Sequence, residues 1–189
     1  MNKGGAYEEA AILYRSNAQS RAIEEALLRA SIPYRIYGGL RFYERLEIKN
    51  AIAYLRIVFN NNDNPSFERS ISNPTRGVGE KTLAKIRQAA KKYNISYIKA
   101  SAKLIDEGSI SGRGGAGLRD YLEFIAGCKG FIEDNTLSDL MELIIKETGL
   151  YAYHAKEPGE KGKTRTENLE ELISATKNFE QSVKDDRTN

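Results

Sequence analysis

The first residues that could do chemistry are a tyrosine and an arginine at the end of a short apolar run. Tyr14 and Arg15 follow residues 11–13 (AIL), and a run of this kind is typical of a buried strand. An arginine at the carboxyl end of a strand in an α/β sheet lies where ligands bind. Its guanidinium could contact phosphate oxygens and stabilise developing charge, and the tyrosine could stack on a base. On these residues alone, a surface cation at Arg15 and a core side chain at Tyr14 remain the alternative.

A second candidate is the turn 73–79 (NPTRGVG), which leads directly into a helix-forming segment. Gly77 and Gly79 let the backbone come close to a ligand, and free N–H groups at a helix start attract phosphate. Arg76 and Lys81 add positive charge beside them. This arrangement is typical of a helix-hairpin-helix contact with a DNA backbone, which positions a protein without reading the base sequence. A plain turn remains the alternative.

A third candidate is the basic segment 161–165 (KGKTR), which includes Thr164 and Arg165 and opens a helix that continues through Asn168. Basic residues at a helix start again favour an anionic partner. A solvated loop remains the alternative reading of this segment.

Several kinds of self-contained site are absent from the sequence. No G-x-x-x-x-G-K-[ST] phosphate loop occurs, because the glycine-rich stretch 112–117 (GRGGAG) lacks the Lys-Ser/Thr pair. Zinc-protease, nucleophile-elbow and EF-hand motifs are also missing. Cys128 and His154 are each the single residue of their type, which excludes an intramolecular disulfide and a cysteine metal cluster and leaves a structural or surface role for both. We therefore expect no metal site.

The elements that would position Tyr14 and Arg15 form a strand–helix–strand unit. A strand over 11–14 is followed by a helix that Ser16 or Asn17 could cap, and a second strand over 34–37 ends at Gly38-Gly39. The helix places Ile23, Ala26, Leu27 and Ala30 on one apolar face. A two-stranded sheet is not stable by itself, which indicates that the chain has been cut from something larger.

The rest of the chain has helical periodicity, so the predicted fold class is mainly α and multi-helical. Residues 108–117 are predicted to be a linker, 157–163 a mobile loop, and the tail after Gln181 frayed. Thr136 and Asp139 have the spacing of a capping box, and Gly149 could end the helix that follows. Apolar stripes predict helices over 48–59, 67–72, 83–93, 95–104, 118–125, 140–145 and 169–179.

Composition is that of an ordinary globular protein. The 189 residues are 40% hydrophobic and 29% charged, with a net charge of +3 and a pI near 8.8. This mildly basic balance permits nucleic-acid binding through a local patch. No signal peptide is visible and no apolar run approaches the roughly 20 residues of a membrane span, so we expect a cytoplasmic protein with no membrane partner.

Four segments in register resemble the UvrD/PcrA/Rep family of superfamily-1 DNA helicases. Residues 11–21 (AILYRSNAQSR) are similar to the family's motif IV, and 33–56 (PYRIYGGLRFYERLEIKNAIAYLR) to motif IVa. Residues 73–83 (NPTRGVGEKTL) and 159–172 (GEKGKTRTENLEEL) also resemble family segments. The resemblance runs from about Ala11 to Phe179, and TRGVG and SNAQSR are more similar to the UvrD (DNA helicase II) branch than to Rep.

The resemblance implies an architecture and a motor activity. Residues 1–107 would be the first segment of the second RecA-like lobe (2A) with a helical extension. Residues 108–189 would be the N-terminal part of its helical insertion (2B), with 181–189 disordered. Family members are ATP-driven motors that move 3′ to 5′ on single-stranded DNA, unwind duplex and act in repair and replication.

The resemblance also implies residue roles. Tyr14 would stack on adenine and Arg15 would contact the γ-phosphate as the catalytic arginine. The residues implied to lie at DNA are Thr75, Arg76, Gly77, Val78 and Gly79 at the backbone, with Thr164, Arg165 and Asn168 at duplex. Lys81 joins the backbone group through its charge beside the helix start.

The departures from the family pattern limit what this chain can do by itself. The phosphate loop, the Asp-Glu pair that holds magnesium, and motifs V and VI are missing from the sequence. The intact protein would use ATP with Mg²⁺, whereas we expect this chain alone to hold no cofactor and to hydrolyse no ATP. Its implied partners are single-stranded and duplex DNA, with repair proteins that the sequence does not identify. A stand-alone helical module that binds DNA or protein without ATP is the alternative function.

Overall fold

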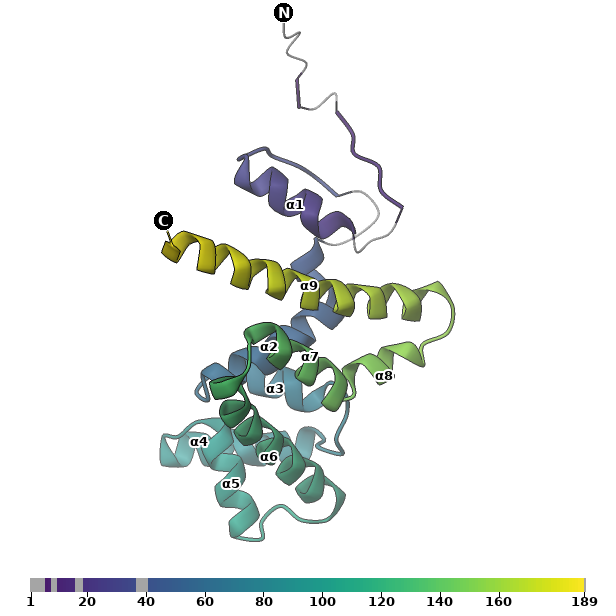
Figure 1. Ribbon diagram of the computed structural model, residues 1–189. Helices are drawn as coiled ribbons and strands as arrows, with labels where there is room; N and C mark the ends of the chain where they lie inside the picture. The colour runs from purple at the N-terminus through teal and green to yellow at the C-terminus, as the bar shows by residue number, and fades with distance from the viewer. Residues whose placement is uncertain (1–5, 8–9, 16–18, 37–40, 189) are drawn as a thin grey trace, which may run out of the picture.

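A computed structural model describes residues 6–7, 10–15, 19–36 and 41–188, with side chains as far as residue 184. Within these ranges the chain forms helices and no strand (Figure 1). The elements are α1 (Ser20–Arg29), the short 3-10 helix η3 (Phe42–Glu44), α2 (Leu46–Phe59), α3 (Asn64–Ser72), α4 (Glu80–Tyr93), α5 (Tyr97–Asp106), α6 (Gly112–Asp134), α7 (Leu137–Glu147), α8 (Leu150–Ala155) and α9 (Glu160–Thr188).

Helix α2 lies at the centre of the core. Ile48, Tyr54 and Ile57 on this helix are fully buried, and α3, α6, α7 and α9 all pack against it. A helix that is apolar on most sides must be surrounded by other elements, which explains why the remaining helices gather around α2. The mainly helical fold class is therefore confirmed.

The ends of several helices follow signals that are visible in the sequence. Thr136 and Asp139 form the predicted capping box at the start of α7, with the Asp139 backbone N–H donating to the Thr136 hydroxyl at 3.1 Å. Asp63 accepts the Ser66 N–H at 3.1 Å and caps α3. Gly149, with φ +80°, ends α7 as predicted. The short polar side chains of Thr136 and Asp63 satisfy backbone groups that a helix start leaves without partners.

The predicted strand–helix–strand unit is not confirmed. The helix exists as α1, but residues 11–14 and 32–36 form no strand. Strand backbone groups need a neighbouring strand, and the backbone N–H of Arg15 instead donates to the Gln19 side chain at 3.1 Å. Leu13 is 95% exposed. The proposed helix cap at Ser16 or Asn17 and the strand end at 37–39 lie outside the described residues.

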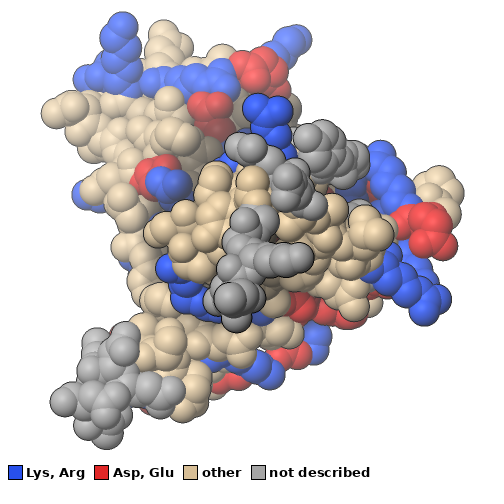
Figure 2. Space-filling model, turned by 90° about the horizontal axis from the view of Figure 1, so that it is seen from above, with Lys and Arg blue, Asp and Glu red and all other residues tan. Residues whose placement is uncertain are grey.

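Helix α1 contacts the molecule through its polar side. Its buried residues are Ser20, Arg21 and Glu24, whereas Leu28 is 60% exposed. Of the apolar face predicted for this helix, Ile23 and Leu27 are partly buried and Ala26 and Ala30 are exposed, so none of the four belongs to the buried core. Figure 2 views the molecule from the end that carries α1 and shows uncharged surface over much of this face, with Lys and Arg mostly around its margin.

Helix α9 crosses the helical body and lies between α1 and the remaining helices (Figure 1). It begins at Glu160 and continues to Thr188, although the sequence predicted a mobile loop over 157–163 and a frayed tail after Gln181. None of the helices in the described part of the chain combines the length and apolar character needed to cross a bilayer.

The glycine-rich stretch predicted as a linker is instead the start of a helix. Helix α6 begins at Gly112, and its first turns pack against the backbone of residues 76–77, in the connection between α3 and α4. A Cβ at Gly114 would lie 3.1 Å from the carbonyl oxygen of Gly77, and one at Gly117 would lie 2.0 Å from that of Arg76. These glycines are therefore required by close backbone approach.

The close approach at Gly117 gives a test of this packing. We expect Gly117→Ala to lower the free energy of unfolding by about 1–3 kcal/mol, because the new methyl group would force α6 away from the Arg76 carbonyl. Urea unfolding followed by circular dichroism measures the change. Gly127→Ala is the matched control on the same helix. A Cβ there meets no atom within 4 Å, so this change should stabilise by roughly 0.5–1 kcal/mol through helix propensity. Equal effects of the two variants would contradict the packing.

Candidate nucleic-acid interface

Residues 73–79 connect α3 to α4 and are called the Gly77 loop below. Gly77 has φ +73°, a left-handed conformation that favours glycine. Thr75, Gly77 and Gly79 are exposed, while Val78 is buried and anchors the loop in the core. Gly79 is the N-cap of α4 and supplies no capping side chain. The loop therefore presents exposed backbone at an uncapped helix start, as a backbone-binding turn requires.

Lys81 adds a cation to this helix start. Its side chain is exposed and makes no ion pair with any residue that the structure describes. The nearby carboxylate of Glu80 accepts from Arg87 at 2.5 Å, a guanidinium that Glu68 also binds, and Glu80 makes no ion pair with Lys81. Lys81 is therefore available to an anionic partner.

Arg76 points into the protein and away from the exposed side of the loop. One terminal nitrogen donates to the hydroxyl of Tyr54 at 2.7 Å and to the carbonyl of Thr148 at 3.2 Å. The guanidinium carbon lies 5.7 Å and 6.0 Å from the ring centroids of Tyr54 and Tyr121, within the range of a cation–π interaction. The Tyr54 hydroxyl donates in turn to the carbonyl of Asn73 at 3.0 Å. Arg76 thus fixes the loop from behind.

The basic start of α9 is arranged differently from that of α4. Arg165 is only partly exposed and donates to Glu157 at 2.5 Å, with Glu47 3.7 Å away on its other side. Thr164 beside it is also partly exposed. Asn168 is 1% exposed, so its side chain lies inside the protein. Of the three residues predicted at this helix, Thr164 and Arg165 have surface to offer and Asn168 has almost none.

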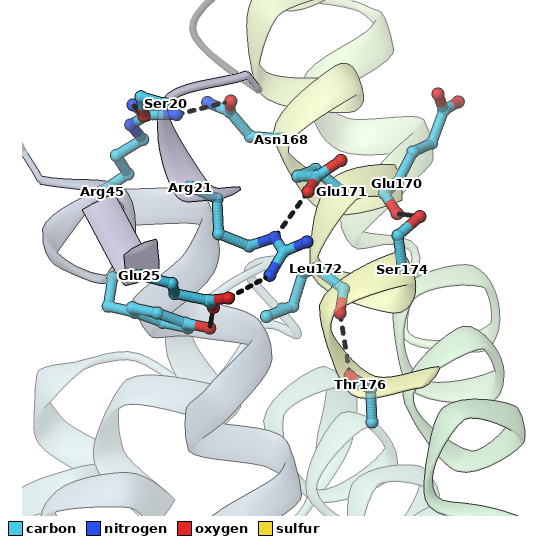
Figure 3. A network of polar contacts seen from close by, with 11 residues as sticks. Ser20, Arg21, Glu25, Arg45, Asn168, Glu170, Glu171, Leu172, Ser174 and Thr176 are labelled. Atoms are coloured by element: carbon cyan, nitrogen blue, oxygen red, sulfur yellow. Dashed lines mark hydrogen bonds and ion pairs between the residues drawn. The ribbon is translucent and has the colours of Figure 1, made fainter. Parts of the chain in front are cut away.

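Asn168 belongs to a polar network that joins α1, α2 and α9; Figure 3 shows its Ser20, Arg45 and Asn168 members. Its amide oxygen accepts from Arg45 at 2.8 Å and its amide nitrogen donates to Glu47 at 2.6 Å. Arg45 also donates to the hydroxyl of Ser20 at 2.7 Å. Arg45 and Glu47 are 9% and 4% exposed, and buried charges of this kind need such partners. The network therefore holds the start of α1 against α9.

A second contact in Figure 3 continues this attachment along α1. Arg21 donates to Glu171 of α9 at 2.5 Å and to Glu25 of α1 at 2.7 Å. Sequence reasoning missed Arg21, Arg45 and Glu47. Their only signal in one sequence is a charge beside an apolar stripe, which is also the pattern of a solvated helix face.

Tyr14 and Arg15 precede α1, the helix that Figure 1 shows at the end of the molecule opposite α4 and α6. Tyr14 is partly buried and Arg15 is exposed. The Arg15 guanidinium makes no ion pair with any residue in the described ranges. The structure therefore brings the residues of the Gly77 loop together at one place and leaves Tyr14 and Arg15 at another.

The polar network predicts the effect of removing one neutral side chain. We expect Asn168→Leu to lower the free energy of unfolding by roughly 3 kcal/mol, because Arg45 and Glu47 would each lose a charge-assisted hydrogen bond while buried. Urea denaturation measures the loss. Glu170→Ala on the exposed side of α9 is the control and should change stability by about 0.5 kcal/mol or less. A loss at Asn168 no greater than that of the control would contradict the network.

Glu157 predicts a pH dependence. The hydrogen bond from His154 Nδ1 at 2.6 Å, followed by the ion pair with Arg165, lowers the pKa of Glu157 to about 2. The unfolded carboxyl has a pKa of about 4.3. Its stabilising contribution is therefore complete above about pH 5 and lost as the pH falls towards about pH 2. Glu157→Gln should lose less stability than the parent over this window in urea unfolding, and the exposed Glu133→Gln should follow the parent. Parallel profiles of Glu157→Gln and the parent would refute the assignment.

Comparison with known proteins places these features in a family. Residues 1–110 match the model of the UvrD-like helicase C-terminal domain. The chain is 46% identical over 185 residues to DNA helicase II of Escherichia coli (strain K12), an alignment that covers 98% of this chain and 26% of that protein. It is 39% identical over 175 residues to ATP-dependent DNA helicase PcrA of Bacillus subtilis (strain 168), covering 93% and 24%. The chain thus spans about a quarter of the length of these relatives. It belongs to the UvrD-like helicase C-terminal domain family.

Proposed function

We propose that this chain is the part of an ATP-dependent DNA helicase that contacts the DNA backbone. The observation that carries the proposal is the Gly77 loop. It presents exposed glycine backbone, an uncapped helix start and the available cation Lys81 at one place. Relatives named as DNA helicases support the identity of the partner.

The roles of the individual residues follow from their exposure. Thr75, Gly77 and Gly79 would approach the phosphates through their backbone, and Lys81 would neutralise one of them. Val78 would hold the loop in place through its buried side chain. Arg76 would stabilise the loop without contacting DNA, since its guanidinium already donates to Tyr54 and Thr148.

The start of α9 would form a second DNA contact, with duplex. Thr164 and Arg165 are the partly exposed residues there. Asn168 would set the position of this helix through Arg45 and Glu47. Residues 1–107 would then be the opening of lobe 2A, and 108–189 the opening of its insertion 2B.

Tyr14 and Arg15 would serve ATP in the intact protein. An accessible guanidinium suits a γ-phosphate and a partly buried tyrosine ring suits stacking on adenine. ATP with Mg²⁺ would supply the energy for 3′ to 5′ movement. Segments that are not in this sequence would hold most of the nucleotide. Roles in repair and replication complete the proposal.

Salt-dependent DNA binding tests the backbone contact. We expect the 189-residue chain to bind a short labelled hairpin with single-stranded and duplex parts, and the affinity to fall steeply as salt rises. Lys81→Gln should reduce the slope of log K against log salt by about 0.9, the value for one lost contact with a duplex phosphate. Fluorescence anisotropy measures both quantities.

The control is Lys91→Gln, at the far end of the same helix. It removes an equal charge and should leave the slope unchanged. A slope that Lys81→Gln does not alter would place the DNA contact elsewhere, and a chain that binds no DNA would refute the proposal.

A further inference from the structure

The first turn of α6 lies directly against the Gly77 loop and carries an arginine that no described residue neutralises. Arg113 is exposed, and its guanidinium makes no hydrogen bond or ion pair within the described residues. Its Cγ lies 3.0 Å, and its Cδ and Nε 3.5 Å, from the position that a Cβ of Gly77 would occupy. The stem of Arg113 thus runs across the glycine at the centre of the loop.

The glycines of this region create that arrangement. Gly77 has no side chain to exclude Arg113, and Gly114 allows α6 to approach within contact distance of both the Gly77 carbonyl and the Thr82 hydroxyl. Three pieces of chain therefore meet here: the loop, the first turn of α4 and the first turn of α6. A larger residue at position 77 or 114 would separate them.

The charges at this meeting point are not balanced by the protein. The amino-terminal end of each helix carries partial positive charge, and a cation in the first turn of a helix is electrostatically unfavourable unless an anion is near. Lys81 and Arg113 both occupy such positions. Glu80, the one acid in the first turn of either helix, shares Arg87 with Glu68, so these three side chains carry one net negative charge against the two cations Lys81 and Arg113. An external anion would relieve this local excess of positive charge.

We infer that Arg113 is a further DNA-backbone residue, and that the first turns of α4 and α6 contact the same stretch of phosphates from two sides. This inference rests on the proposed function of the Gly77 loop and extends it to α6. Arg113 takes the place at the surface that the sequence assigned to Arg76. A guanidinium can bind one phosphate in a bidentate manner, whereas Lys81 supplies a point charge.

The inference is tested on the 189-residue chain with the labelled hairpin over a series of salt concentrations. Arg113→Gln should reduce the slope of log K against log salt by about 0.9 and weaken binding about eightfold near 0.1 M salt. Arg113→Lys should keep the parent slope, because the charge remains. The double variant Arg113→Gln/Lys81→Gln should reduce the slope of log K against log salt by about twice the value for one phosphate contact. Arg119→Gln, an exposed arginine further along α6, is the control and should bind like the parent.

Thermal unfolding supplies a readout that needs no DNA. Because Arg113 has no partner among the described residues and occupies a helix start, Arg113→Gln should leave the melting temperature unchanged or raise it. A lowered melting temperature would show a structural role and overturn the inference.

The outcomes separate the two proposals. If Lys81→Gln reduces the slope and Arg113→Gln does not, the Gly77 loop remains a DNA contact and α6 is excluded from it. If Arg119→Gln weakens binding as much as Arg113→Gln, the effect is general charge and the inference fails. If no variant changes binding, or if the chain binds no DNA, both proposals fall.

Discussion

The guanidinium of Arg76 lies against the rings of Tyr54 and Tyr121 and donates to the carbonyl of Thr148. It thereby joins the Gly77 loop to α2, to α6 and to the end of α7. The exposed side of the loop depends on this contact, because a turn that displays bare backbone has few side chains of its own to hold it. Val78 and the close approach of α6 add to the same anchorage. A rigid turn approaches a ligand with less conformational entropy to lose than a mobile one.

Much of the helical structure could be predicted from the sequence. Capping residues such as Thr136 and Asp139 act within one turn, so their signal is local. The start of α6 could not be predicted, because its glycines serve a backbone contact with a segment about forty residues earlier. The predicted strands over 11–14 and 34–37 were wrong for a related reason: their described residues have the pattern of strands but no neighbouring strand to pair with.

In the candidate site, too, the features with a local signal could be predicted and those that depend on contacts between distant segments could not. The Gly77 loop was found from the sequence because glycines, a helix start and basic residues occur together in one short run. The sequence could not show which arginine would face outwards. Arg76 is adjacent to buried tyrosines and turns inwards, whereas Arg113 is distant in sequence and lies across Gly77. The sequence shows that both positions are charged. Only the packing shows that the Arg76 guanidinium stabilises the protein and that the Arg113 guanidinium is exposed to a partner.

Helix α1 is attached through Arg21 and Ser20, while Leu28 faces outwards. Because the polar side of α1 is buried and Leu28 is exposed, the positions of this helix that tolerate substitution differ from those of an ordinary amphipathic helix. A polar replacement at the exposed Leu28 would cost the fold little, whereas a lysine in place of Arg21 would lose the planar, two-sided geometry that reaches Glu25 and Glu171 together. A substitution profile of α1 would therefore be the inverse of an ordinary amphipathic helix, with its charged positions as the invariant ones.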